Sequence, residues 1–111
     1  MNHLIRPMLY DAYHRIVNVS NPKGIKRVYS VVGNICETDT FGWDRKINEV
    51  REGDILALLN AGAYGYSMSS NYNSRLRPAE VLLRKGKMYL IRKREEMDDL
   101  LRNQVEIANF K

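Results

Sequence analysis

Residues 15–35, RIVNVSNPKGIKRVYSVVGNI, contain two apolar runs separated by a cluster of turn-forming residues. The runs Arg15 to Val19 and Ile25 to Ile35 are rich in valine and isoleucine, and Ser20 to Gly24 places asparagine, proline and glycine between them. This pattern is typical of two β-strands joined by a turn. The stretch therefore predicts a mainly β fold.

A short helix is predicted before these strands. The apolar residues that recur there at helical spacing are Ile5, Met8, Leu9 and Ala12. Pro7 is compatible with a first helical turn, so we expect the helix within Leu4 to Tyr13. Arg6 and Tyr10 are four positions apart, and they should therefore share one helix face.

The segment after the first strands is predicted to be mostly loop. Residues Thr38 to Gly53 are rich in glycine, aspartate and asparagine and contain few aliphatic side chains. Trp43 and Ile47 are its expected hydrophobic anchors. A largely buried strand should follow at Asp54 to Asn60.

Three patterns organise the rest of the chain. The small residues of Ala61 to Gly65 would let a ligand approach the backbone. Ala79 to Arg84 and Lys87 to Lys93 flank Lys85-Gly86 as a predicted hairpin. Acidic residues followed by an apolar stripe predict a covering helix over Glu95 to Ala108.

Composition favours a soluble, cytoplasmic protein with a single domain over residues 1–111. The longest apolar runs are too short to cross a bilayer, and Arg6 and Pro7 interrupt any leader-like run, so neither a membrane partner nor a signal peptide is expected. The single cysteine suits a reducing compartment. No cluster of cysteine and histidine implies a metal site, and His3 and His14 are interpreted as structural.

The net charge of +5 allows two interpretations. The lysines and arginines gather at Lys23 to Arg27 and at Arg84 to Arg94, where they can form solvated strand faces and hairpin tips. They could also create a positive field that attracts an anionic cofactor and a dicarboxylate substrate. Nucleic acid is not the expected partner, because aromatic residues are not interleaved with the basic ones on one strand.

Three patches, taken in order, resemble one known family. They are Arg6-Pro7-Met8-Leu9-Tyr10 with Tyr13-His14 behind it, the pair Cys36-Glu37, and AGAYGYSMSSNYNSRLRPAEV over Ala61 to Val81. Together they resemble the C-terminal β-domain of diaminopimelate decarboxylase. The resemblance implies a Greek-key-like β-barrel or sandwich with a short N-terminal helix and a C-terminal helix.

The same resemblance implies that the chain is part of a larger enzyme. Members of the family carry an N-terminal (β/α)8 barrel that holds pyridoxal 5'-phosphate through a lysine. Such a barrel takes about 250 residues, so the 111 residues here cannot contain it. We interpret Met1 as an internal methionine or a trimmed start.

Family members use matching residues in catalysis and binding. The resemblance implies that Cys36 is the proton donor and that Glu37 contacts the distal amino group of the substrate. It implies that Arg6 and Tyr10 bind the distal carboxylate and that Tyr64 reaches both substrate and cofactor. A free thiol titrates near pH ~8.5, and the neighbouring Glu37 should raise the pKa of Cys36, which keeps the thiol protonated.

The resemblance also implies a homodimer in which the Cys-Glu loop enters the active site of the partner subunit. The sequence departs from the common family pattern directly after this pair, where Thr38-Asp39-Thr40 replaces Ser-Gly-Asp. From the residues alone, Cys36 is also compatible with a small buried hydrophobe and Glu37 with an exposed surface residue.

Other functions remain compatible with the sequence. The nearest is a decarboxylase of the same fold for ornithine, arginine or carboxynorspermidine. A different class is a non-catalytic basic β-barrel that binds single-stranded nucleic acid. A third is a dimerisation module whose site residues are vestigial.

We predict that the purified 111-residue chain does not decarboxylate diaminopimelate. The electron sink is the cofactor, and the lysine that should hold it belongs to the barrel domain. Carbon dioxide release is the measurement, with pyridoxal phosphate added to the chain. Turnover above the rate of free cofactor would contradict the prediction.

Overall fold

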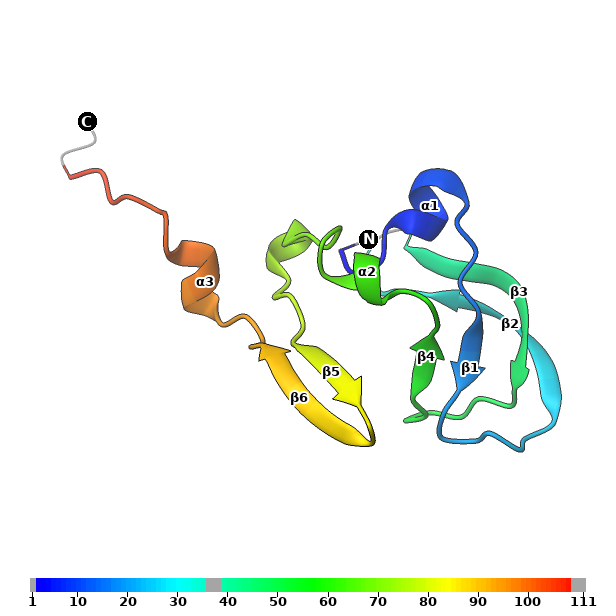
Figure 1. Ribbon diagram of the computed structural model, residues 1–111. Helices are drawn as coiled ribbons and strands as arrows, with labels where there is room; N and C mark the ends of the chain where they lie inside the picture. Colours follow the sequence, from blue (N-terminus) through cyan, green and yellow to red (C-terminus); the bar gives the residue numbers. More distant parts are fainter. Residues whose placement is uncertain (1, 36–38, 109–111) are drawn as a thin grey trace. The chain divides into compact units, whose positions relative to one another are not determined.

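The computed structural model describes residues 2–35 and 39–108, which contain six strands and three short α-helices (Figure 1). In chain order these are α1 (Arg6–Tyr10), β1 (Ile16–Asn18), β2 (Lys26–Val32), β3 (Thr40–Asn48), β4 (Leu56–Leu58), α2 (Gly62–Gly65), β5 (Glu80–Arg84), β6 (Lys87–Arg92) and α3 (Met97–Leu101). A 3-10 helix covers Tyr72–Ser74. The residues form a first unit, Met1–Ser70, and a second unit, Asn71–Lys111.

The first unit contains two antiparallel strand pairs. β1 pairs with β4, with Ile16 opposite Leu58 and Asn18 opposite Leu56. β2 pairs with β3 from Lys26 opposite Asn48 to Val32 opposite Thr40. Both β1 and α1 pack against β3, which therefore connects the elements of this unit.

The expectation of a loop over Thr38 to Gly53 is wrong, because β3 occupies nine of these residues. Its turn-forming residues lie in an irregular part of the ladder, where Asp44 has a φ of 48° and the pairing with β2 shifts register on either side of Val31. A bulged strand accepts residues that an even ladder disfavours. Ile47 is buried as an anchor, but Trp43 is 62% exposed and is not one within the described residues.

Polar side chains outnumber apolar ones among the buried residues of the first unit. The buried apolar side chains are Leu4, Ile16 and Ile47. The buried polar residues are Asn2, His14, Asn18, Asp39, Thr40, Asn48 and Ser69. A buried polar group is costly unless it is hydrogen-bonded, so the partners of these side chains determine the local structure.

Asn18 links the end of β1 to the loop that precedes β4. Its Nδ2 donates to the Glu49 carbonyl at 2.9 Å and to the Asp54 carboxylate at 2.8 Å. Its Oδ1 accepts from the backbone N–H of Asn21 at 3.0 Å. Asn48 at the end of β3 donates to the Asn21 carbonyl at 3.0 Å. The predicted turn at Ser20 to Gly24 is thus held by asparagine side chains on both sides.

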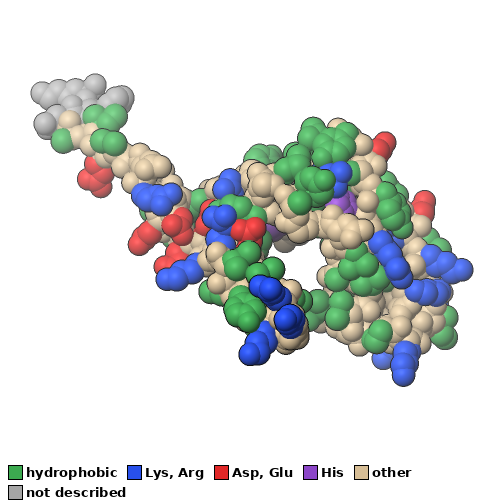
Figure 2. Space-filling view, in the orientation of Figure 1, with side chains coloured by type: hydrophobic (Ala, Val, Ile, Leu, Met, Phe, Trp, Pro, Cys, Tyr) green, Lys and Arg blue, Asp and Glu red, His purple; other side chains and the backbone are tan. Residues whose placement is uncertain are grey.

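The second unit contains the predicted hairpin, with β5 and β6 paired around Lys85-Gly86. Both turn residues have positive φ, 48° and 72°, as a tight two-residue hairpin turn requires. Every residue of β6 is exposed, so side chains on both faces of the hairpin meet solvent. Figure 2 shows hydrophobic and basic side chains next to each other on it.

The helix expected over Glu95 to Ala108 is wrong in length, because α3 ends at Leu101. The beginning agrees with expectation: the Glu96 side chain accepts from the N–H of Asp99, and the Asp99 carboxylate accepts from the N–H of Glu96. Val105, in the apolar stripe that should have continued, is 84% exposed. Short helices need packing of an apolar face, which the described residues do not provide here.

The mainly β fold and the short N-terminal helix are confirmed, whereas the described residues form no closed barrel. They form three separate two-stranded sheets. The strands expected at Arg15 to Val19, Ile25 to Ile35 and Asp54 to Asn60 are present in shorter form as β1, β2 and β4.

No described helix has the length and apolar character needed to span a membrane. That residues 1–111 are one domain stays a prediction.

We predict that Asp54 makes the first unit sensitive to acid. The side-chain hydrogen bond from Asn18, and then the backbone N–H of Arg51, lower the pKa of Asp54. Its stabilising contribution is fully present above the unfolded pKa of about 4 and is lost as the pH falls through the lower folded pKa. Asp54→Asn should therefore reduce the fall in urea midpoint between about pH 5 and pH 3.

Glu52→Gln is the matched control, because Glu52 is an exposed carboxylate in the same loop. Hydrogen bonds from Arg27 and Arg51 lower the pKa of Glu49, and this group remains in both variants. The difference between the two variants therefore isolates Asp54. Equal acid dependence of Asp54→Asn and Glu52→Gln would contradict the prediction.

Candidate functional site

The helix α1 positions Arg6 and Tyr10 beside each other, as their spacing predicts. Pro7 lies in its first turn, and Asp11 ends the helix in the left-handed conformation with φ 57°. Arg6 Nε donates to the Tyr10 hydroxyl at 2.7 Å. The guanidinium carbon also lies 5.4 Å from the centre of the Tyr10 ring.

Tyr64 joins this pair from α2, which follows β4. The guanidinium carbon of Arg6 lies 3.7 Å from the centre of the Tyr64 ring, a close cation–π contact. Gly62 and Gly65 flank Tyr64, and no heavy atom lies within 4 Å of the place where a Cβ would be at either glycine. The structure thus brings together Arg6, Tyr10 and Tyr64 and leaves open space beside Tyr64.

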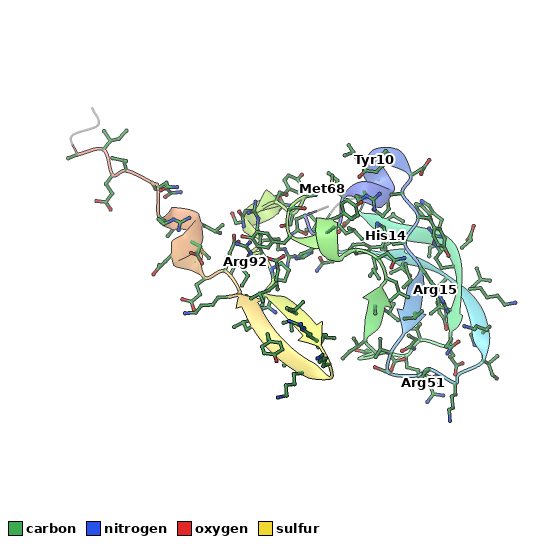
Figure 3. All side chains as sticks on the ribbon, viewed as in Figure 1. Tyr10, His14, Arg15, Arg51, Met68 and Arg92 are labelled. Atoms are coloured by element: carbon green, nitrogen blue, oxygen red, sulfur yellow. The ribbon has the colours of Figure 1, made fainter. Side chains whose placement is uncertain are left out.

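His14, which is labelled in Figure 3, connects the Arg6 guanidinium to the β1–β4 ladder. Its side chain is buried, with Nε2 3.2 Å from Arg6 Nη1 and Nδ1 3.0 Å from the Leu59 carbonyl oxygen. Arginine only donates and a carbonyl only accepts, so these partners assign the proton to Nδ1 and make Nε2 the acceptor. The ring also meets Tyr64 edge-on, at 6.4 Å between centres and 70° between planes.

Met68 completes what we call the Arg6 cluster, which consists of Arg6, Tyr10, His14, Tyr64 and Met68. The Tyr10 hydroxyl donates to Met68 Sδ at 3.9 Å. Thioether sulfur is a weak acceptor. The hydroxyl can therefore turn to a stronger acceptor if a ligand offers one.

Two of the five N–H groups of the Arg6 guanidinium are used in these hydrogen bonds. Among residues 2–35 and 39–108, no carboxylate forms an ion pair with Arg6. Within these ranges, three N–H groups form no hydrogen bond and the positive charge faces no carboxylate, so both can meet a ligand. A planar carboxylate is the natural partner, because guanidinium binds it through two parallel hydrogen bonds.

Cys36 and Glu37 lie outside the described residues, but both sides of their loop are described. Asp39 is buried, and its carboxylate accepts from the backbone N–H of Ile35 at 3.2 Å. A Cβ at Gly33 would clash with Asp39 Oδ2, so any other residue at this position would force the carboxylate to shift. Gly33, Ile35 and Asp39 are therefore in close contact with one another on the two sides of residues 36–38 in the sequence.

One cavity among the described residues is separate from the Arg6 cluster. It has a volume of about 460 Å³ and is lined by side chains of β1, β2, β3 and neighbouring turns, including Arg15, Lys26, Arg45 and Lys46. None of the five cluster residues lines it. We therefore place the candidate site at the Arg6 cluster, where the guanidinium, two tyrosines and a histidine contact one another. Over the described ranges, no group of His, Cys, Asp or Glu side chains is arranged to hold a metal ion.

Residues 1–62 match the family model described as the C-terminal sheet domain of pyridoxal-dependent decarboxylases. This match covers more than half of the 111 residues and includes Arg6, Tyr10 and His14. The chain belongs to this family. The resemblance noted from the sequence is thereby confirmed for the family.

Curated relatives of this chain include several diaminopimelate decarboxylases. The one from Methanothermobacter thermautotrophicus is 51% identical over 105 residues, which are 93% of this chain and 24% of the relative. The one from Aquifex aeolicus is 51% identical over 108 residues, 96% of this chain and 26% of the relative. A crystal structure of diaminopimelate decarboxylase from Methanocaldococcus jannaschii matches with a TM-score of 0.89 and 43% identity, over 100% of this chain and 26% of that one. The chain thus spans about a quarter of the length of these relatives.

Proposed function

We propose that this chain is the C-terminal domain of a diaminopimelate decarboxylase, which converts meso-diaminopimelate to L-lysine and carbon dioxide. The observation that carries the proposal is the Arg6 guanidinium, which is held by Tyr10, His14 and Tyr64 and has three N–H groups without a hydrogen bond to any described residue. The identity to named diaminopimelate decarboxylases supports the same substrate.

The substrate explains why an arginine is needed at this site. Diaminopimelate carries two amino acid centres, and decarboxylation at one centre leaves the second carboxylate intact. In this proposal Arg6 binds that distal carboxylate through paired hydrogen bonds. The Tyr10 hydroxyl exchanges the weak Met68 sulfur for a carboxylate oxygen and adds a further hydrogen bond.

The cofactor is pyridoxal 5'-phosphate, which supplies the electron sink for the carbanion that forms when carbon dioxide leaves. The residues present here fit one side of such a group, because the glycines beside Tyr64 leave space for a ring to approach. Tyr64 would contact cofactor and substrate while its ring supports Arg6. The phosphate loop and the lysine are assigned to the barrel domain, which the chain does not contain.

Cys36 and Glu37 complete the proposed site. The Cys36 thiol would donate a proton to the substrate carbon that has lost carbon dioxide. Glu37 would accept hydrogen bonds from the distal ammonium group and keep the neighbouring thiol protonated. We place both residues in the active site of the partner subunit of a homodimer. The hydrogen bond from the Ile35 N–H to the buried Asp39 carboxylate supports this role, because it ties together the residues on the two sides of the pair in the sequence.

The surface of the second unit supports a place within a larger protein. A two-stranded hairpin alone is marginally stable in water. Both faces of β5 and β6 are largely exposed, including Leu83 and Met88. Apolar side chains in this arrangement need a covering surface, which the remaining three quarters of the enzyme would provide.

The experiment that tests the function is a substrate comparison with the full-length enzyme. We expect kcat/KM for diaminopimelate to exceed that for ornithine by about 10⁴-fold, because a site built to bind a polar group rejects a substrate that lacks it. Arginine and carboxynorspermidine are the other substrates to compare. A kcat/KM for any of the three that equals or exceeds the value for diaminopimelate would overturn the proposal.

We predict that Arg6→Lys in the full-length enzyme lowers kcat/KM for diaminopimelate by about 10- to 100-fold. Lysine keeps the charge but loses the paired hydrogen bonds, which are worth about 1.5–3 kcal/mol. The loss should be smaller for ornithine, which has no distal carboxylate. Arg15→Lys is the control, since Arg15 is exposed and lies outside the Arg6 cluster. An equal loss of kcat/KM for both substrates would show that Arg6 does not bind the distal carboxylate.

A further inference from the structure

The Arg6 side chain depends on its neighbours for its position. It extends from α1, a helix of five residues that buries none of them. Tyr10 belongs to the same helix and therefore moves with Arg6, and its side chain is exposed. Although α1 packs against β3, Arg6 and Tyr10 move together, so the orientation of the guanidinium relative to β1 and β4 depends on partners outside the helix.

His14 is the member of the cluster that is fixed to the strands. It directly precedes β1, and the next residue, Arg15, accepts a backbone hydrogen bond from Leu59 at 2.8 Å. The imidazole donates from Nδ1 to the Leu59 carbonyl at 3.0 Å, so backbone and ring are both attached to the strand that precedes α2. The ring is fully buried, which leaves it little freedom to rotate.

The imidazole presents a single lone pair to Arg6. Because the Nδ1 proton is committed to Leu59, Nε2 accepts from Arg6 Nη1 at 3.2 Å. This bond sets the rotation of the guanidinium plane, and the Tyr64 ring supports one face of it. The remaining N–H groups then point in a defined direction before a ligand arrives, which lowers the ordering cost of binding.

A neutral acceptor suits this role better than a charged one. A carboxylate at the position of the imidazole would form an ion pair with Arg6 and compete with a carboxylate substrate. The neutral imidazole orients the guanidinium and adds no negative charge beside it. Within the described residues no other side chain accepts from Arg6 except Tyr10.

We infer that His14 is a positioning residue for substrate binding: it holds the Arg6 guanidinium in the orientation that receives the distal carboxylate. This inference rests on the proposed function. It assigns His14 a role that the sequence alone did not indicate, because a lone buried histidine is ordinarily structural.

Two substitutions separate this role from a structural one. In His14→Asn the side-chain amide can take the place of Nδ1 and donate to Leu59, but it is too short to reach Arg6. In His14→Gln the side-chain carbonyl can take the place of Nε2 and accept from Arg6, while the contact with Leu59 is lost. A positioning role predicts that Asn is the harmful change, whereas a purely structural role predicts that Gln is.

The measurement is inhibition of the full-length enzyme by L-lysine and by cadaverine. L-lysine keeps the distal carboxylate of the substrate, whereas cadaverine has no carboxylate. For His14→Asn we expect the inhibition constant of L-lysine and the KM for diaminopimelate to rise about tenfold, with kcat and the inhibition constant of cadaverine nearly unchanged. His14→Gln should keep the wild-type ratio of the two inhibition constants, even if its melting temperature falls.

A wild-type ratio in a folded His14→Asn enzyme would overturn the inference. If His14→Asn does not fold, His14→Gln decides, through the inhibition constant of cadaverine divided by that of L-lysine. A preserved ratio supports positioning, and a ratio lowered about tenfold contradicts it. Failure of the proposed function is distinguishable, because the wild-type enzyme would then not prefer diaminopimelate over ornithine.

Discussion

The antiparallel pairing of β1 with β4 is the constraint on which the first unit depends. The ladder is extended at its two ends by backbone hydrogen bonds from Leu59 to Arg15 at 2.8 Å and from Val19 to Ile55 at 2.9 Å. Each end also carries a buried polar side chain, His14 at one and Asn18 at the other. His14 holds the guanidinium of α1, and Asn18 holds the loop before β4. A three-residue strand thus organises both the candidate site and the turn opposite it.

The sequence pattern predicted the helices and strands whose residue types favour the conformation that they adopt. Alternating or β-branched runs located β1, β2 and the β5–β6 hairpin, and Pro7 with its apolar neighbours located α1. β3 was missed because Gly42 and Asp44 favour turns, and only the shifted pairing with β2 makes them acceptable in a strand. The predicted C-terminal helix was too long because its stripe finds nothing to pack against within the described residues.

The site was predictable to the extent that its contacts are local or carried by a motif. The pairing of Arg6 with Tyr10 follows from a separation of four residues, and the position of Tyr64 was implied by the family resemblance. His14 was assigned a structural role because no residue next to it in the sequence indicates a binding function. Its decisive partner is a backbone carbonyl 45 positions away, and every residue type has such a carbonyl. Only the fold reveals that these groups meet.

The close approach of Asp39 to Gly33 has a consequence for protein engineering. The segment that contains the proposed proton donor Cys36 is an attractive one to exchange between related enzymes. An exchange of residues 34–38 that retained both Gly33 and Asp39 would preserve the attachment points of the graft. A side chain at position 33 would displace the Asp39 carboxylate and release the Ile35 N–H that it binds. The boundaries of a transferable module are thus set by a glycine and an aspartate that need not touch the substrate.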